Sequence, residues 1–176
     1  VIVERNTNGS QLGTYRSTDS GATWTALPIP SGSCHYWTFQ DICTYSGSSR
    51  GQCWYDLTLE VKSGTSVWAG GTAIFKTTNG GTSWVDVCPQ SVHTDQHAIA
   101  FGSDGKVWVG NFGFQDPPCV DPLFAVQHGS LSAQHDSVSA FRPDGTPISG
   151  PGGYTSGGIS WPQGTVSDRR GNIWIA

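Results

Sequence analysis

The sequence predicts an all-β fold made of short strands joined by tight turns, on three observations. Charged residues make up only 12% of the 176 residues, and glutamate occurs only at Glu4 and Glu60, which excludes long surface helices stabilised by Glu–Lys pairs. Two octapeptides with the composition of hairpin turns match each other position by position. A short strand pattern centred on tryptophan occurs three times.

The two octapeptides are STDSGATW at 17–24 and TTNGGTSW at 77–84. In each, we expect an Asp or Asn side chain to cap backbone N–H groups, a glycine to adopt positive φ, and a tryptophan to anchor the turn on its sheet. The residues expected to build these turns are Ser17, Asp19, Gly21, Trp24, Thr77, Asn79, Gly81 and Trp84. We therefore interpret Asp19 and Asn79 as structural, not catalytic.

The octapeptides resemble the Asp-box, or BNR repeat, of a β-propeller superfamily that includes sialidases, xyloglucan-cleaving hydrolases and sortilin-type receptors. The tryptophan strands, at 66–70, 106–110 and 172–176, resemble NHL-type propeller blades. The resemblance implies a β-propeller of four-stranded antiparallel blades. No Arg-Ile-Pro motif is present and both glutamates fall in expected strands, so no sialidase residue can be carried over.

The spacing of the repeat sets the expected blades. Trp68 and Trp108 are 40 residues apart, one blade, whereas longer separations elsewhere indicate inserts at 28–52 and 112–136. Strands are expected at 1–5, 12–16, 23–27, 55–61, 67–70, 73–77, 83–87, 96–101, 107–111, 138–142, 146–149, 163–167 and 172–176. These strands make about three and a quarter blades. Residues 1–176 are thus expected to be part of a single propeller domain with an incomplete ring, completed by more of the same chain or by another copy.

The up-and-down order of a blade separates two faces. The octapeptide turns join third to fourth strands and lie on one face, whereas the two inserts and the crossover at 88–94 lie on the other. Every cysteine and histidine falls on or beside this second face. Long loops on one face of a rigid scaffold are where binding usually occurs, so we expect the ligand site there.

Polar and aromatic residues begin the innermost strands on that face. The candidates for ligand binding are Trp54, Tyr55, Gln96, His97, Trp161 and Gln163. Asp56 and Asp95 occupy equivalent places in neighbouring blades and could form the acid/base pair of a glycosidase. The alternative is that both carboxylates cap strand ends or bind backbone N–H groups of the crossovers.

Three potential metal ligands lie close together in the sequence. His93, Asp95 and His97 alternate, so in an extended chain they point to one side and could bind a metal ion. The alternative is that they are hydrogen-bonded polar residues that fix the inserts. No other cofactor is expected.

The five cysteines indicate the compartment. None forms a C-x-x-C pair, and the candidates for disulfides are Cys34, Cys43, Cys53, Cys88 and Cys119. Widely spaced cysteines in a lysine-poor sequence favour disulfides in a secreted, cell-surface or periplasmic protein, with buried reduced thiols as the alternative.

Charge and hydropathy limit the partners. The net charge is −4 with nine scattered basic residues, and no apolar run approaches the roughly 18 residues needed to span a bilayer. We therefore expect neither nucleic acid nor a membrane span. The sequence predicts a non-catalytic extracellular module that binds a glycan or a protein. The alternative is a glycoside hydrolase that uses Asp56 and Asp95.

Overall fold

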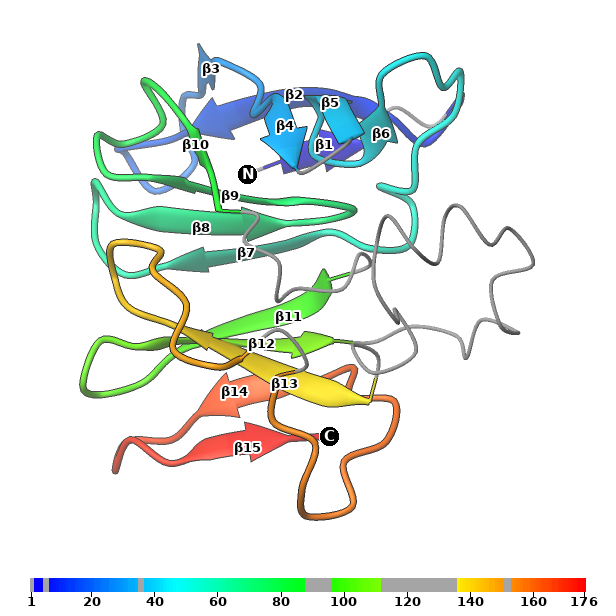
Figure 1. The fold of residues 1–176 in the computed structure, drawn as a ribbon. Coiled ribbons are helices and arrows are strands. Elements are labelled where there is room, and N and C mark those ends of the chain that lie inside the picture. Colours follow the sequence, from blue (N-terminus) through cyan, green and yellow to red (C-terminus); the bar gives the residue numbers. More distant parts are fainter. Residues whose placement is uncertain (1, 5–6, 35–36, 88–95, 112–135, 151–152) are drawn as a thin grey trace. The chain divides into compact units, whose positions relative to one another are not determined.

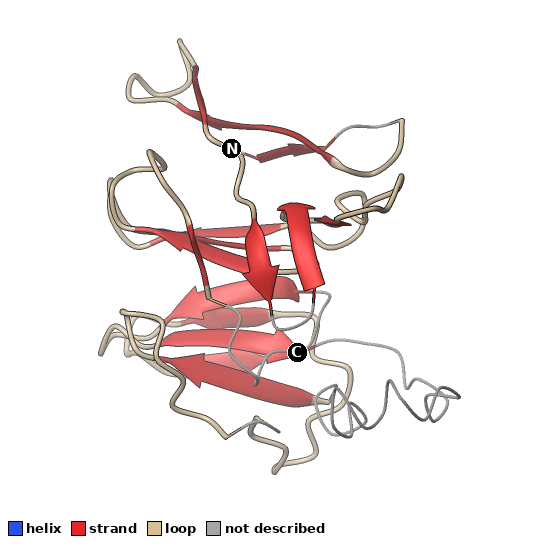
Figure 2. Cartoon of the chain, turned by 45° about the horizontal axis from the view of Figure 1, so that its top comes forward, coloured by secondary structure: helices blue, strands red, loops and turns tan. Residues whose placement is uncertain are grey.

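The computed structural model describes residues 2–4, 7–34, 37–87, 96–111, 136–150 and 153–176. Over these residues the chain is all-β, without a helix, and every strand pairing is antiparallel (Figures 1 and 2). The prediction of an all-β fold is confirmed. The chain divides into two compact units, Val1–Pro89 and Gln90–Ala176, which are described separately.

The first unit contains two sheets that follow the up-and-down order of propeller blades. In the first sheet the order is β1-β2-β3, and in the second it is β10-β9-β8-β7, a complete four-stranded meander (Figure 1). The strands are β1 (Ile2–Glu4), β2 (Gln11–Arg16), β3 (Thr25–Leu27), β7 (Thr58–Val61), β8 (Val67–Gly70), β9 (Ile74–Thr77) and β10 (Val85–Asp86). Each lies within a range expected from the sequence or extends it by one residue.

The insert at 28–52 forms a sheet of its own, which the sequence pattern did not predict. Its strands are β4 (Gly32–Cys34), β5 (Trp37–Asp41) and β6 (Thr44–Tyr45), in that order. Phe39 of β5 and Ile42 are buried against Ala69 and Phe75 of the second sheet. The insert thus supplies part of the hydrophobic core of the first unit.

The second unit contains a three-stranded and a two-stranded sheet. The first has the order β11-β12-β13 and packs against β14 of the second. The strands are β11 (Gln96–Phe101), β12 (Val107–Asn111), β13 (Ser137–Phe141), β14 (Thr165–Ser167) and β15 (Ile173–Ile175). Every residue of β13 is buried, which makes this strand the centre of the core of the unit.

The strand expected at 146–149 does not form as a regular strand. The outer edge of β13 instead carries two isolated bridges, Phe141 to Pro147 and Val138 to Tyr154. Proline has no N–H to donate to a ladder, although Ile148 N–H still donates to Ala140 O at 2.8 Å. The fourth position of this sheet is therefore irregular.

No described helix is long and apolar enough to cross a membrane.

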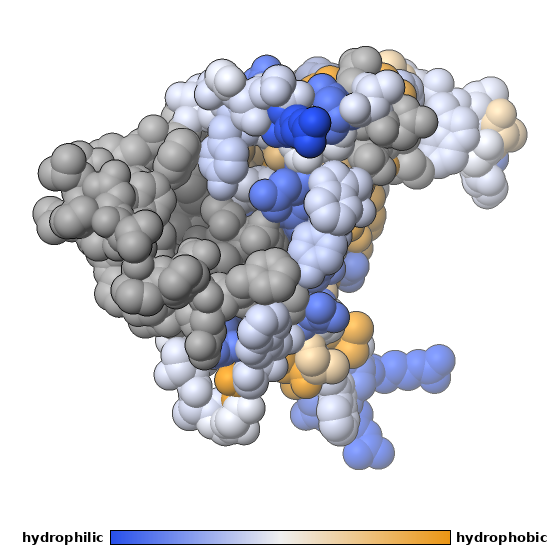
Figure 3. All heavy atoms as spheres, turned by 90° about the vertical axis from the view of Figure 1, so that its right-hand side faces the viewer, coloured by the Kyte–Doolittle hydropathy of each residue, from blue (hydrophilic) through white to orange (hydrophobic). Residues whose placement is uncertain are grey.

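Figure 3 views the molecule from the right-hand side of Figure 1, where the loop after β6 lies. Most of the described surface in this view is hydrophilic or neutral, and hydrophobic side chains appear only in small groups.

Candidate functional site

The two octapeptide turns contain equivalent hydrogen bonds. Asp19 Oδ1 accepts the backbone N–H of Thr23 at 2.9 Å, and Asn79 Oδ1 accepts that of Ser83 at 3.0 Å. The hydroxyl of the first residue of each octapeptide accepts the N–H of the positive-φ glycine four residues later, at 2.8 and 3.0 Å. The Asp19 and Asn79 side chains thus each close their own turn.

The Asp19 carboxylate is exposed yet fully engaged. Hydrogen bonds from the Thr23 hydroxyl, the Thr23 backbone and the Ser17 hydroxyl lower the pKa of Asp19 from 3.8 to about 2. A carboxylate held ionised in this way is a poor general acid. The geometry therefore suits a structural role for these turns.

The insert lies at the opposite ends of the strands from the octapeptide turns. It contacts the β1–β2 loop, where Gly51 N–H donates to Asn8 O at 2.9 Å and Cys53 N–H donates to Gly9 O at 2.8 Å. It also contacts the β8–β9 loop, where Ala73 N–H donates to the backbone oxygen of Ile42. The insert therefore contacts loops of both sheets at the ends away from the octapeptide turns.

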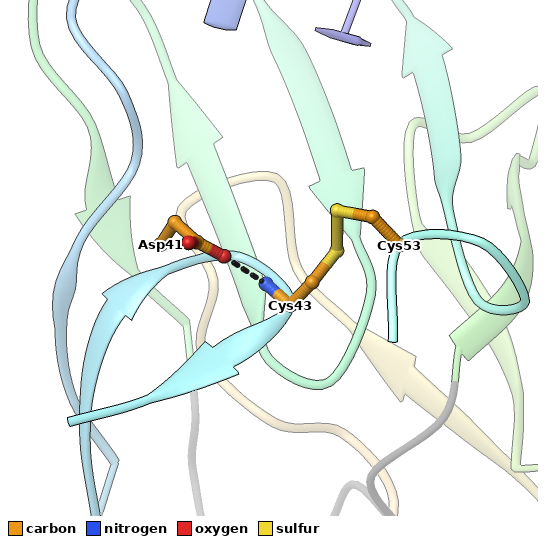
Figure 4. Close-up of side chains that lie close together, drawn as sticks. All are labelled: Asp41, Cys43 and Cys53. Carbon is orange, nitrogen blue, oxygen red and sulfur yellow. Dashed lines mark hydrogen bonds between the residues drawn. A yellow bond between two sulfur atoms is a disulfide. The ribbon is translucent and has the colours of Figure 1, made fainter. Parts of the chain in front are cut away.

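A buried disulfide fixes the end of the insert. Cys43 and Cys53 are bonded, with their Cα atoms 5.2 Å apart, and Asp41 Oδ1 accepts the N–H of Cys43 at 2.8 Å (Figure 4). Because both sulfur atoms are in the disulfide, they are not thiolate ligands for a metal ion despite the nearby carboxylate. Cys88 and Cys119 lie outside the described residues, as does the side chain of Cys34.

An exposed aromatic pair follows the disulfide directly. The exposed fractions of Trp54 and Tyr55 are 67% and 37%, and their ring centroids are 5.4 Å apart at an interplanar angle of 40°. The chain turns tightly here, since the N–H groups of Tyr55 and Asp56 both donate to Gln52 O. Two large aromatic rings thus lie exposed on a hydrogen-bonded turn, among the residues that the sequence analysis proposed for ligand binding.

Asp56 lies immediately after this pair but is completely buried. Its proposed partner Asp95 lies outside the described residues, as does His93. The predicted acid/base pair and the predicted metal site therefore stay predictions. The structure does not bring the Asp56 carboxylate to the molecular surface.

The remaining candidates lie in the second unit. Gln96 is buried at the start of β11, His97 is partly buried, and Gln163 is exposed. Trp161 is partly exposed and has a φ of 53°, an uncommon conformation for a bulky residue. Its N–H donates to Asp136 Oδ1 at 2.7 Å. The role of Asp136 was missed because no local pattern links residues 25 positions apart.

The described fold defines an all-β protein of small meandering sheets that presents an aromatic pair beside a disulfide-bonded insert. No family model matches the chain, and neither does any curated protein. Among solved structures, the structure of this chain is similar to the one described as "YCF48 bound to D1 peptide", with 11% sequence identity and a TM-score of 0.45. The match covers 92% of this chain and 39% of the YCF48 chain, so this chain spans less than half the length of that neighbour. A likeness of this size establishes neither family nor function.

Proposed function

We propose that this chain is a non-catalytic, extracellular β-propeller module that binds a glycan through Trp54 and Tyr55. The main support for this proposal is the exposure of this aromatic pair on a turn that directly follows the Cys43–Cys53 disulfide. Contiguous apolar patches on a protein surface often mark binding sites, and the adjacent Trp54 and Tyr55 rings form such a patch. The rest of the propeller, from the same chain or another copy, belongs to the same proposal.

The chemistry of the pair suits sugar rings. An aromatic ring packs against the C–H face of a pyranose, whereas the sugar hydroxyls stay hydrogen-bonded at the edge. Exposed polar side chains at Ser48, Arg50 and Gln52 lie in the same loop and offer donors and acceptors for those hydroxyls. The loop thus supplies both an apolar aromatic pair and polar side chains close to it in sequence.

Rigidity adds to affinity at this site. The Cys53 N–H bonds to Gly9 O, and the Trp54 ring lies close against Gly9, whose φ is 73°. Binding to a group that is already ordered costs less conformational entropy than binding to a free loop. We therefore expect the turn to bind without rearrangement.

Binding is favoured over hydrolysis because of Asp56. A general acid or base must lie within hydrogen-bonding reach of the substrate, and the Asp56 side chain has no exposed surface. The disulfide supports the extracellular part of the proposal, because such bonds persist mainly in oxidising compartments.

A glycan array followed by titration calorimetry tests this function. We expect Trp54→Ala to weaken binding of the best glycan by at least about tenfold, through lost stacking and burial. Trp174→Ala is the matched control, because Trp174 is similarly exposed on β15 and is expected to leave affinity unchanged. Equal affinities of the parent and Trp54→Ala, or equal losses in both variants, would overturn the proposal.

A further inference from the structure

A groove of about 280 Å³ lies between the first two sheets, at the octapeptide-turn end and away from the insert. Its walls are mainly apolar side chains, contributed by β3, β7, β8 and the two turns. The apolar residues are Trp24, Leu27, Leu59, Val61, Val67 and Trp84. Since it lies within the first unit, both walls belong to one compact body.

Three large hydrophobic side chains in this groove remain in contact with water. Trp24, Leu59 and Val61 are exposed by 50%, 37% and 55% of their surface. The two turns differ here, because the Trp84 ring is partly buried and its Nε1–H donates to Pro28 O at 3.1 Å. A contiguous apolar surface of this kind in a groove favours a ligand-binding role.

One end of the groove carries a cation. Arg16 lines the groove at the end of β2, and its Nη1 donates to Gly80 O at 3.4 Å, the long limit of a hydrogen bond. Among the described residues, no carboxylate forms an ion pair with Arg16. A guanidinium has five N–H donors, and within the described part of the chain Arg16 forms one hydrogen bond, so donors remain for an anion.

The other polar groups near this end are already engaged. Gly80 N–H donates to Thr65 O at 2.9 Å, and Gly81 N–H donates to the Thr77 hydroxyl at 3.0 Å. The body of a ligand in the groove would therefore lie against apolar walls, with an anionic group at Arg16. The volume is near the lower end of small-molecule pockets, about 300 Å³, which suits a single chain better than a ring system or a two-chain lipid.

We propose that this groove binds a free alkyl carboxylate of medium length, with the chain against Trp24, Leu59 and Val61 and the carboxylate on Arg16. The negative charge of the carboxylate is opposite to that of the guanidinium, and planar carboxylates form paired hydrogen bonds with arginine. The site is separate from the glycan surface and does not depend on it.

Titration of the whole chain with octanoate and decanoate below their micelle-forming concentrations, and with decanol below its solubility limit, tests this site. Each buried methylene strengthens binding by about fourfold, so decanoate is expected to bind about sixteenfold more tightly than octanoate. Decanol has a chain of the same length without the charge, and it is expected to bind to the groove at least about tenfold more weakly than decanoate.

Two variants and a control assign the residues. We expect Arg16→Gln to lower decanoate affinity to the level of decanol and to leave decanol affinity unchanged. Val61→Asp should weaken the binding of both decanoate and decanol. Arg169→Gln, at an exposed arginine of the second unit, should change the binding of neither. The absence of saturable decanoate binding, or unchanged decanoate affinity in Arg16→Gln, would overturn the proposal. Circular dichroism of each variant shows whether it is folded, and Trp54→Ala must retain decanoate binding.

Discussion

At the residue scale, the two octapeptide turns perform the same task with different side chains. Asp19 and Asn79 both accept the backbone N–H four residues later, but only Asp19 can titrate. Ser20 and Gly80 occupy the same position, and both have positive φ, 58° and 71°. One turn can therefore serve as the reference for substitutions in the other.

Ser20→Gly is expected to stabilise the protein. A left-handed conformation costs a non-glycine residue about 1–2 kcal/mol. Glycine avoids this cost, but its greater freedom in the unfolded chain destabilises the folded state by about 0.5–1 kcal/mol. The net gain in the free energy of unfolding is then between about 0 and about 1.5 kcal/mol, measurable by urea denaturation. A decrease in that free energy would contradict the left-handed conformation of Ser20.

Asp19→Asn is expected to remove one source of acid sensitivity. The folded pKa of Asp19, about 2, lies below its ordinary 3.8, so folding favours the ionised form. The resulting stability is present above about pH 4 and is lost as pH falls through the folded pKa.

Urea denaturation between pH 4 and pH 2 checks this effect. The parent should lose more stability over that interval than Asp19→Asn, because the amide that replaces the carboxylate does not titrate. The similarly low pKa of Asp168, about 2, contributes equally to both proteins. Identical pH profiles would contradict the role of the Asp19 hydrogen bonds.

At the element scale, the insert is held by close backbone approach as much as by its disulfide. Gly9 has a φ of 73°, and a side-chain carbon added there would overlap Gly51 O and lie 2.7 Å from Trp54 Cδ1. The glycine thus allows the insert to lie on the β1–β2 loop and the Trp54 turn to lie beside it.

Gly9→Ala is expected to destabilise the protein by at least about 2 kcal/mol, through left-handed strain and overpacking. It should also weaken glycan binding, because Trp54 must move. Gly64→Ala is the matched control, since Gly64 has open space around it and no positive φ. Thermal unfolding of the two variants measures the difference, and equal melting temperatures would rule out the close approach.

The sequence predicted elements well where a repeat marked them and poorly where contacts decided them. The turns and most strands could be located from the octapeptides and from tryptophans such as Trp68. The insert strands could not, because β4–β6 form against the second sheet and have no matching repeat. Pro147 carried a signal against a regular strand at 146–149. For the site, the sequence singled out Trp54 and Tyr55 as ligand-binding candidates, but it did not predict the burial of Asp56.

At the scale of the first unit, the two ends of the sheets have different properties. One end carries turns whose polar side chains are satisfied internally, beside an apolar groove. The other end carries the disulfide-bonded insert and the aromatic pair. The central claim is that the insert end is the glycan-binding surface.

The most direct test is a ¹⁵N NMR spectrum of the tryptophan indole N–H groups during titration with the bound glycan. Two indoles serve as internal references, because Trp84 bonds to Pro28 O and Trp174 bonds to Asp168 Oδ2. We predict that the Trp54 signal, assigned with Trp54→Phe, shifts in proportion to saturation and that the two references remain in place. A saturating glycan that shifts either reference and leaves Trp54 unmoved would contradict the claim.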